Sequence, residues 1–471
     1  MSVEAIGYDQ IRVRGLNIEY LKDMKVSFKI NEHVKLNLTA VLNSNESIYN
    51  AINTKNIEVY YGNDKTIFYG YVTNIDISNN EEVKEVKIEA KSMSYLLDIK
   101  SKSRSFQNQS MSISSLISTI LGEYSSVNYI VNLPDSSIGE LLVQYEETDW
   151  EFLKRVISKY NLGIFTYCTS KNIELSLGTP NQNQNVDLST VRYKVYKDLN
   201  EFSDISKNSL SDACESEYVT YEVDSYDVLS IGDNVNFMSH SFNVLEGSYE
   251  ICDGILLNRY KLRSRNGLRQ KRDFNNKIIG SSLGGEIIGV QGELVQVHLD
   301  IDSSQSTSTA KWFKFSTMSA SSDGSGWYCM PEIGDSVKVY FPTNDEDESF
   351  AVSAVSNYKQ GAGESKDRMG DPSTKYLRTS EDKEVRLTPN GINVSCNSGQ
   401  SEFNLSSDGT LSINSANNVN INSSGGINIS ANSSFLINAG ESVNIASDKG
   451  SKLVLNSSGE VEEWGANVNN N

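Results

Sequence analysis

The carboxyl-terminal part of the chain repeats one pattern with a period of eight residues. From Phe403 to Ile445, each repeat holds two apolar residues on either side of a third residue, and the spacers are almost entirely Ser, Asn, Gly, Ala and Asp. Each triplet predicts a very short strand with one buried face, and each spacer predicts a turn. Because so short a repeat cannot bury its apolar stripe against itself, we expect it to be stable only by stacking and by winding together with other copies. The predicted stripe consists of Phe403, Leu405, Leu411, Ile413, Val419, Ile421, Ile427, Ile429, Phe435, Ile437, Val443, Ile445, Leu453 and Leu455.

Three such chains around a shared apolar axis would form a rigid rod, which we predict over residues 381–459. The rod opens with irregular turns at Val385-Arg-Leu387 and Ile392-Asn-Val394. Its last triplet, Leu453-Val-Leu455, is displaced by ten residues rather than eight, which predicts a looser turn near the end. Residues 460–471 are expected to form a tip structure or a frayed end.

Length and charge narrow the remaining possibilities. A chain of 471 residues predicts about three domains. The net charge of −19 argues against nucleic acid as a primary partner, because phosphate binding needs a basic surface. One basic segment departs from this balance, and it is either an exposed face or linker that balances acidic neighbours or a docking patch for an acidic partner subunit. Its residues are Arg259, Lys261, Arg263, Arg265, Arg269, Lys271 and Arg272.

Signals for membranes and export are missing from the sequence. No apolar run reaches the ~20 residues that span a bilayer, and the start Met1-Ser-Val-Glu-Ala lacks the basic and apolar regions of a secretory signal. We therefore expect the chain to be made and folded in the cytoplasm. The five cysteines are scattered and never form a CxxC spacing, so we predict reduced thiols rather than disulfides or a zinc site.

Strand patterns dominate the rest of the chain. Residues 1–100 and 186–277 each alternate short strands with turn signals, which predicts two small β-barrels. Residues 278–357 contain five strand-length segments and predict a five-stranded barrel of the OB type. The Gly-rich, polar residues 358–380 are interpreted as a linker. The predicted fold class is therefore mainly β: two β-barrels with inserted helices, an OB-type barrel and a C-terminal trimeric intertwined β-helix spike.

The segment 101–185, between the two predicted barrels, contains two predicted helices. Each begins at a hydroxyl side chain that can cap it and ends at a glycine, with apolar residues at helical spacing in between. The boundary residues are Ser110 or Ser112 and Gly122 for the first helix, and Thr148 with Glu151 and then Gly163 for the second.

The sequence offers little catalytic chemistry. The three histidines, His33, His240 and His298, lie in predicted strands or barrel segments, where a lone histidine is usually structural or on the surface. Motifs of metalloproteases, hydrolases, phosphate loops and EF-hands are missing. We therefore predict no enzyme activity, no cofactor and no metal site. The acidic run Asp345-Glu-Asp-Glu348 could hold a cation, but we favour a charged, solvated hairpin tip.

Four motifs, in order along the chain, share their residues with one known family. They are Phe68-Tyr-Gly-Tyr-Val72, Gln144-Tyr-Glu-Glu-Thr-Asp-Trp-Glu-Phe-Leu-Lys-Arg155, Ile231-Gly-Asp-Asn-Val235 and Pro331-Glu-Ile-Gly-Asp-Ser-Val-Lys-Val-Tyr-Phe341, the last with Trp327 just ahead of it. In these residues the chain resembles VgrG proteins and phage baseplate hub proteins. The first and third motifs resemble strands of their two hub barrels, the fourth resembles their small-barrel signature, and the octad rod resembles their spike.

The resemblance implies a fused hub and cell-puncturing spike of a contractile injection machine, either a phage tail, a tailocin-type bacteriocin or a type VI-like system. It implies a homotrimer that binds a hexameric tail tube protein, other baseplate subunits and, briefly, the target cell envelope. It also implies assembly in the cytoplasm and action outside the cell. The chain lacks both a lysozyme-like insert and the His-x-His tip of some phage spikes, so we expect no wall cutting, no tip metal and a separate tip protein.

Two alternatives stay open at this point. Stalked trimeric adhesins and receptor-binding fibres share the octad-like composition, although no export signal or anchor supports a bacterial-surface adhesin. A wall-degrading activity hidden in the hub barrels is the second alternative, because paired carboxylates for glycoside cleavage are not recognisable in so acidic a sequence.

Overall fold

The chain divides into two compact units, residues 1–357 and 358–471, which are described separately. Part of the predicted linker, residues 358–369, and the end of the predicted tip, residues 468–471, lie outside the described residues. None of the helices described is both long and apolar enough to cross a membrane. The computed structural model describes residues 5–80, 83–181, 186–323, 325–353 and 370–467.

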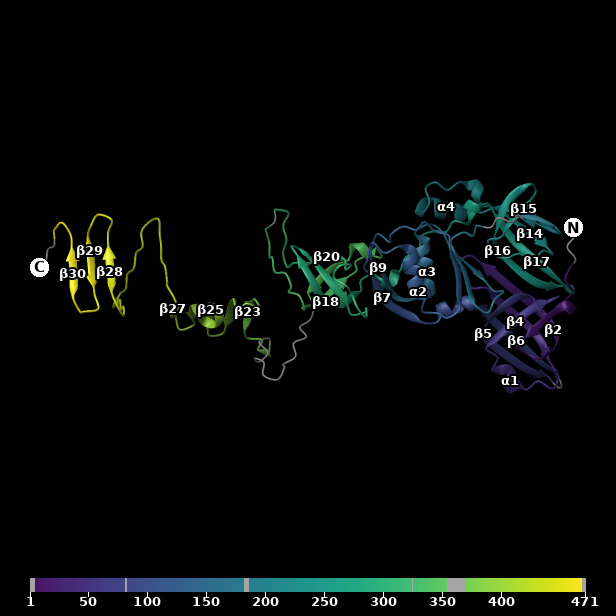
Figure 1. Ribbon diagram of the computed structural model, residues 1–471, viewed down its shortest axis with the longest axis horizontal. Coiled ribbons are helices and arrows are strands. Elements are labelled where there is room, and N and C mark those ends of the chain that lie inside the picture. Colours follow the sequence, from purple (N-terminus) through teal and green to yellow (C-terminus); the bar gives the residue numbers. More distant parts are fainter. Residues whose placement is uncertain (1–4, 81–82, 182–185, 324, 354–369, 468–471) are drawn as a thin grey trace. The chain divides into compact units, whose positions relative to one another are not determined.

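The largest sheet holds twelve strands, and it joins the two segments that the sequence predicted as separate barrels (Figure 1). β2 from the first segment pairs with β16 from the second, with Phe28 opposite Gly247. The order is β1-β4-β5-β6-β3-β2-β16-β17-β14-β13, with β15 paired to β16 and β12 to β15. The strands are β1 (Ile11–Arg14), β2 (Ile18–Lys29), β3 (Lys35–Leu42), β4 (Asn56–Tyr61), β5 (Lys65–Asn80), β6 (Val83–Ser92), β12 (Val186–Asp187), β13 (Arg192–Lys197), β14 (Val219–Ser225), β15 (Asn234–Phe237), β16 (His240–Cys252) and β17 (Ile255–Arg263).

The core of the large sheet is continuous across the β2–β16 seam. Phe28 of β2 packs against Tyr249 of β16, with ring centroids 5.2 Å apart, and against Tyr260 of β17 at 6.4 Å. All three rings are buried. Gly247 makes room for them, because a Cβ at this position would lie 2.6 Å from the Phe28 ring and 2.8 Å from the Tyr260 ring. The two strand-rich segments therefore share both a ladder and a core.

Two short helices, α1 (Ile48–Ile52) and α4 (Leu199–Asn208), lie in the segments predicted as barrels and were not predicted. The helices of the intervening segment begin where their caps predict. Ser112 caps α2 (Ile113–Leu121) by accepting a hydrogen bond from the Ser115 amide. Thr148 and Glu151 form the predicted capping box at the start of α3 (Asp149–Ser158).

Gly163 does not end α3, contrary to the prediction. The helix stops at Ser158, and Asn161 takes the left-handed conformation, with φ at 53°, that reverses the chain. Around the two helices lie the pair β7 (Ser101–Phe106) and β9 (Leu142–Thr148), and a sheet of β8 (Val127–Val131), β10 (Ile164–Tyr167) and β11 (Ile173–Leu177).

The predicted five-stranded OB-type barrel is confirmed. The strand order is β20-β19-β18-β21-β22. A parallel bridge between Phe315 and Ala351 closes the barrel by linking the ends of the order, and the Ser316 amide donates to the Ala351 carbonyl at 2.8 Å. The strands are β18 (Ser282–Gln291), β19 (Leu294–Leu299), β20 (Trp312–Lys314), β21 (Ser336–Tyr340) and β22 (Phe350–Ser353).

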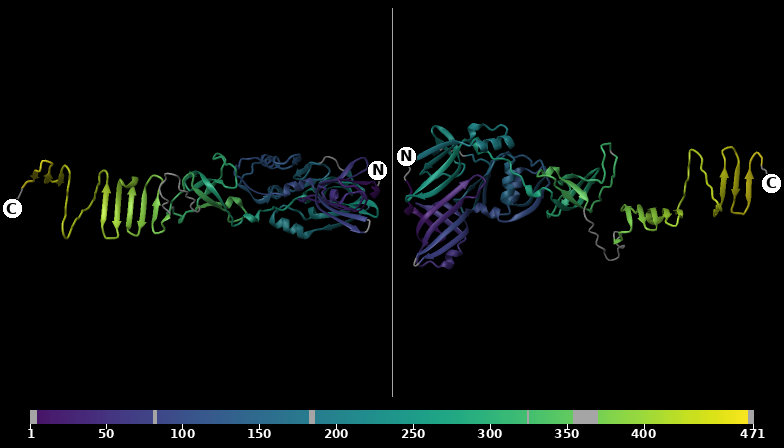
Figure 2. Two further views of the ribbon diagram at one scale, coloured as in Figure 1. Left: turned by 90° about the horizontal axis from the view of Figure 1, so that it is seen from below. Right: turned by 180° about the vertical axis from the view of Figure 1, so that it is seen from behind.

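The carboxyl-terminal unit contains two antiparallel sheets (Figure 2). The predicted triplets at 419–421, 427–429 and 435–437 lie between these sheets in the sequence and outside any strand. The intertwined β-helix therefore stays a prediction. The first sheet consists of β23 (Lys375–Arg378), β24 (Glu384–Thr388), β25 (Gly391–Cys396), β26 (Ser401–Ser406) and β27 (Leu411–Ser415), and the second of β28 (Val443–Ala446), β29 (Lys452–Leu455) and β30 (Val461–Trp464).

We predict that Gly247→Ala destabilises the large sheet by about 1–3 kcal/mol, because the added methyl group forces apart two buried rings. Differential scanning calorimetry of the full chain should show a lower melting temperature for the transition of the amino-terminal unit. Ser248→Ala is the matched control, since Ser248 is the next residue of β16 and points to the outer face. Equal melting temperatures for the two variants would contradict the packing described at the seam.

Candidate functional site

The predicted apolar stripe forms one side of the first sheet in the carboxyl-terminal unit. Phe403 in β26 lies opposite Ile413 in β27, and Leu405 lies opposite Leu411. Because side chains alternate along a strand, these four residues share one side of the sheet. β24 and β25 continue both rows, and Leu377 of β23 continues the row of Phe403 and Ile413. We call this surface the apolar face, and it consists of Leu377, Val385, Leu387, Ile392, Val394, Phe403, Leu405, Leu411 and Ile413.

Burial on the two sides of this sheet is the reverse of that in a globular domain. Phe403 and Leu405 are 38% and 40% exposed, whereas Asn404 between them is half-buried. On the same polar side, Asn393 of β25 lies opposite Asn404 and is only 7% exposed. A contiguous exposed apolar surface of this kind marks an interaction site.

The other predicted stripe residues fall into two groups. In the second sheet, Val443 lies opposite Leu455 and Ile445 lies opposite Leu453, so the structure brings these four together. Among the described residues, the remaining six lie outside any strand, and all are exposed. They are Val419, Ile421, Ile427, Ile429, Phe435 and Ile437.

Sequence reasoning underestimated how far the apolar face extends toward the amino terminus. The residues 385–387 and 392–394, predicted as irregular opening turns, form the regular strands β24 and β25. Leu377 of β23 was missed, although it lies opposite Val385 and is 50% exposed. The segment Lys-Tyr-Leu-Arg offers only one aliphatic residue, so the alternation of apolar and polar residues that predicts a strand was weak there.

A buried ion cluster joins α3 to the five-stranded barrel within the amino-terminal unit. The Arg155 guanidinium donates two hydrogen bonds to the Glu147 carboxylate, at 2.8 and 2.9 Å, and one to Glu346 at 2.8 Å. It also donates to the Val143 carbonyl at 2.8 Å. All three charged side chains are less than a tenth exposed. We call this cluster the Arg155 joint.

The acidic run 345–348 is only in part the solvated tip that the sequence predicted. Three of its four residues are exposed, whereas Glu346 is 6% exposed and bound to Arg155. The exposed Asp347 carboxylate accepts from the Leu141 amide at 3.1 Å and pairs with Lys311. A carboxylate buried as deeply as Glu346 is stable because it receives a cation. The run therefore docks the barrel through Glu346 and Asp347 and leaves its other two side chains in solvent.

Further hydrogen bonds and apolar contacts fix the same junction. The Gln107 side chain donates to the Val297 carbonyl at 3.0 Å and accepts from the Lys311 amide at 3.1 Å. Asp302 accepts from the Ser105 amide at 2.6 Å. Leu141 and Val143, which precede α3, lie in the apolar core of the barrel. Barrel and helical segment therefore pack as one body.

A second buried carboxylate, Asp149, fixes the start of α3. It accepts from Arg104 at 2.7 Å, from Gln144 at 2.9 Å and from the Tyr124 hydroxyl at 2.5 Å, and it pairs with Lys102. Burial disfavours the charged carboxyl, but these donors outweigh burial and hold the pKa of Asp149 below its ordinary value. The carboxylate thus ties β7 and β9 to the helix.

The motif 144–155 is explained by these contacts. Besides Asp149 and Arg155, Trp150 packs at a tilt against the buried His33 ring at 4.2 Å between centroids, and Phe152 stacks on Phe106 at 5.6 Å. His33 bonds Ser94 at 2.8 Å, which fits the predicted structural role. The motif connects the large sheet, the helical segment and the five-stranded barrel.

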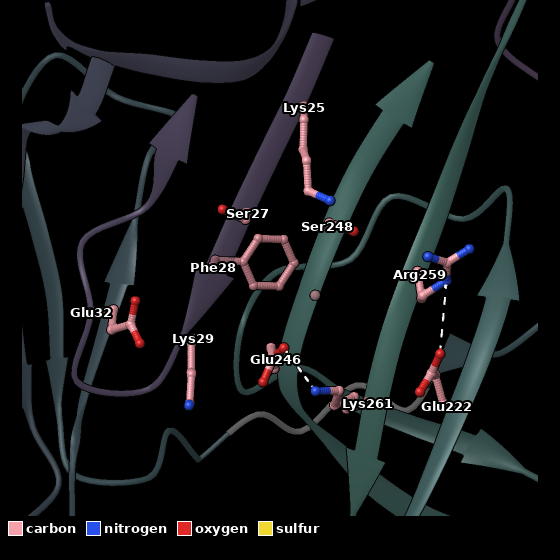
Figure 3. Close-up of a pocket in the computed structure, with 11 residues that line it drawn as sticks. Lys25, Ser27, Phe28, Lys29, Glu32, Glu222, Glu246, Ser248, Arg259 and Lys261 are labelled. Carbon is pink, nitrogen blue, oxygen red and sulfur yellow. Dashed lines mark hydrogen bonds and ion pairs between the residues drawn. The ribbon is translucent and has the colours of Figure 1, made fainter. Parts of the chain in front are cut away.

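A groove of about 350 Å³ lies over the β2–β16 seam (Figure 3). Charges alternate from strand to strand along it: Lys29 on β2, Glu246 on β16, Lys261 on β17 and Glu222 on β14. Glu246 pairs with Lys261 at 3.0 Å. Because neighbouring strands carry opposite charges, the groove stabilises the seam rather than presenting one sign of charge to a ligand.

The basic segment balances acidic neighbours, as one of its two interpretations predicted. Arg263 pairs with Glu201 at 2.7 Å, and Arg269 pairs with Glu217 at 2.8 Å. Arg259 pairs with Asp224 at 2.9 Å, and Lys271 with Asp204 at 3.2 Å. The segment is not a linker, because its first half forms β17.

Metal and thiol chemistry find little support in the part of the chain that the structure describes. No group there of three or more His, Cys, Asp or Glu side chains could hold a metal ion. All five cysteines are free. Burial raises the pKa of the Cys168 thiol to about 12, which makes it a poor nucleophile at neutral pH.

Comparison with known proteins places two family domains on this architecture. Residues 19–195 match the phage tail baseplate hub (GPD) family, and residues 290–355 match the type VI secretion system/phage-baseplate injector OB domain. The first match contains the motif 144–155, and the second contains most of the five-stranded barrel. No curated protein matches the chain.

Solved structures share the fold. The E. coli c3393 protein, a type VI secretion system component described as similar to T4 tail proteins gp27 and gp5, superposes with a TM-score of 0.55 at 12% identity, covering 72% of this chain and 98% of that one. A chain of the Francisella PdpA–VgrG complex in its lidded form gives 0.55 at 10% identity, covering 86% and 79%. The half-lidded Francisella complex gives 0.54 at 9% identity, covering 86% and 87%.

We predict that Arg155→Met costs about 3–5 kcal/mol of stability, because it leaves two carboxylates buried without their cation. The melting temperature of the amino-terminal unit, measured by calorimetry, should fall accordingly. Lys154→Met is the control, since Lys154 pairs only with the half-exposed Asp273 at 3.4 Å. Similar melting temperatures for both variants would show that the Arg155 joint does not stabilise the amino-terminal unit.

A pH dependence follows from Asp149. Its folded pKa lies below the ordinary value of 3.8, so its ionised form stabilises the fold above that pH, and the stabilisation is lost as the pH falls through the folded pKa. Asp149→Asn should therefore be less stable than wild type at neutral pH, and the difference in melting temperature should become smaller below pH 3.8. Thermal melts across this range measure that difference, and Asp76→Asn, at an exposed position of β5, is the control. A difference that does not change with pH would contradict the assignment.

Proposed function

We propose that three copies of this chain form the hub and spike of a contractile injection machine, since residues 19–195 match the phage tail baseplate hub family and residues 290–355 match the injector OB domain. The hub segments bind the hexameric tail tube, and the carboxyl-terminal units wind into a trimeric intertwined β-helix. Sheath contraction drives this needle through the envelope of the target cell.

The apolar face is the observation that carries the proposal. Its side chains are exposed in the single chain while polar residues on the other side are half-buried, so the sheet lacks a covering partner. Each apolar side chain that turns to a shared axis contributes about 1.5–3 kcal/mol before the ordering entropy is subtracted. Twelve octad positions per chain make this the largest contribution that the unit can gain by assembly.

The distribution of charge along the chain also favours self-association through the octads. The whole chain carries −19, so copies repel one another over most of their surface. Between Phe403 and Ile445 only Asp408 and Glu441 are charged. Copies therefore meet with the least repulsion along the octads.

The middle octads support winding rather than simple side-by-side contact. The triplets at 419–421, 427–429 and 435–437 pair with no strand in the part of the chain that the structure describes. A strand without a neighbour exposes its amides and carbonyls, and other copies can supply the missing ladder. Winding three chains together satisfies the backbone and buries the stripe in one step.

The amino-terminal unit supplies a rigid base for this needle. The Arg155 joint and the neutral contacts around Gln107 hold the five-stranded barrel on the hub. An axial force that enters the hub therefore passes to the barrel without bending at the junction. Other baseplate subunits and a separate tip protein complete the particle, which is assembled in the cytoplasm and acts outside the cell as a phage tail, a tailocin or a type VI-like device.

We predict that Ile427→Asp combined with Ile429→Asp disrupts the trimer of the full chain. Three copies would bring six carboxylates to an apolar axis that offers no cations, and this costs several kcal/mol per trimer. Sedimentation velocity should show monomers where wild type shows trimers, with the melting of the amino-terminal unit unchanged. Asn428→Asp adds one charge at the outward position between them and should leave the trimer intact.

If the double variant sediments as wild type, the axial assignment of the octads is wrong. Electron microscopy of intact particles provides an independent check, because a hub and spike must lie on the axis of the tube. A chain found on lateral fibres would support the receptor-binding alternative instead.

A further inference from the structure

A second apolar surface lies on the five-stranded barrel, apart from the carboxyl-terminal unit. The long loop between β20 and β21, residues 316–334, presents four large apolar side chains to solvent. Met318 is 86% exposed, Ile333 71%, Tyr328 68% and Trp327 48%. We call residues 316–334 the apolar loop. Nothing in the described part of the amino-terminal unit covers these side chains.

The apolar loop has a defined shape. Trp327 donates its amide to the Ser319 carbonyl at 2.9 Å, and the Tyr328 hydroxyl donates to the Gly292 carbonyl at 2.9 Å. Gly326, with φ at 151°, sits where a Cβ would come within 2.4 Å of the Ser319 oxygen, so only glycine permits this close approach of the two arms. A surface held in shape before binding loses little conformational entropy when it is covered.

The charge of the apolar loop suits contact with a second copy of this chain. Its nineteen residues include two charged ones, Asp323 and Glu332, and no lysine or arginine. A chain with a net charge of −19 repels its own copies, so they can touch only where charge is sparse. The apolar loop shares this property with the octads. A basic or acidic partner would instead select a surface with charge of the opposite sign.

Chain connectivity brings the loops of different copies within reach. Sixteen residues separate Ser353, the last described residue of the barrel, from Gly370 in the next unit, and a chain of this length spans at most about 60 Å. If the carboxyl-terminal units form a trimer, the three barrels are therefore tethered near one axis. Tethering raises their mutual concentration to about the millimolar range, where even a weak contact forms.

On the premise of the proposed trimer, we infer that the apolar loop packs against the five-stranded barrel of a neighbouring copy and forms a second interface between subunits. The loop thereby orients the three barrels around the axis. The spike interface holds the copies together, and the loop interface sets their arrangement above the spike.

Cys329 provides a direct test, because it is exposed and follows Tyr328 in the loop. In the full chain, Cys214, Cys252 and Cys396 are changed to Ser, and the purified trimer is treated with a short reagent that carries one maleimide and one succinimidyl ester, which joins a thiol to a lysine. We expect covalently linked copies joined from Cys329 to a lysine on the barrel of the neighbouring copy, identified by mass spectrometry. The matched control keeps Cys214, also exposed, and carries Cys329→Ser, and it should link at least roughly tenfold less.

A substitution test uses the same full chain. Trp327→Ser combined with Ile333→Ser should raise the concentration at which the trimer separates by at least roughly tenfold, as measured by sedimentation equilibrium. Ile99→Ser combined with Ile130→Ser is the control, since both residues are exposed and apolar but lie outside the loop. Circular dichroism and calorimetry check that every variant is folded.

The outcomes separate this inference from the proposed function. Wild-type monomers at all concentrations would refute the trimer itself. A wild-type trimer with an unlinked, freely alkylated Cys329 and an unchanged loop variant would overturn the loop interface alone, and would point to another particle protein as its occupant.

Discussion

The amino-terminal unit depends on a guanidinium that is shared by two domains. Arg155 lies on a helix of the hub segment, and its two carboxylate partners come from the preceding strand and from the OB barrel. Removing either side leaves charge buried without compensation, so the cluster is stable only when the parts are docked. The same motif carries Asp149, which ties two strands to the helix start. A short segment thus positions three parts of the unit at once.

In the proposed assembly, the carboxyl-terminal unit follows the opposite rule, because other copies complete its burial. The apolar face is exposed in the single chain, whereas Asn393 on the other side of the sheet is buried and Asn404 is half-buried, so the sheet lacks a cover. The proposed assembly supplies the missing cover through identical residues rather than through a specialised partner. The parts of the amino-terminal unit are rigidly docked, whereas the apolar residues of the carboxyl-terminal unit become buried only in the proposed assembly. This combination suits the proposed hub and spike, which is first positioned and then transmits an axial force.

Local signals in the sequence were sufficient for part of this fold. Ser112 and Thr148 marked the helix starts because capping is decided within three residues. The OB strands were predicted because alternation and turns are also local. The β2–β16 pairing was missed, since the register between distant strands leaves no trace in either one. Glu346 was assigned to solvent because its partner, Arg155, lies 191 positions away. The apolar stripe was identified, but whether its middle triplets form strands depends on neighbours outside the chain.

The seam between β2 and β16 also sets the order of events during synthesis. β2 ends at Lys29 and β16 ends at Cys252, so about 220 residues separate the two halves of one ladder. At roughly 5–20 residues per second, the ribosome needs about 10–45 s to deliver the second strand after the first. Throughout that interval the edge of β2 from Lys25 to Lys29, where polar and apolar residues alternate, stays open to the wrong partner, including the same strand on a neighbouring nascent chain. We therefore expect chaperones that bind unpaired strands to bind this protein while it is still attached to the ribosome.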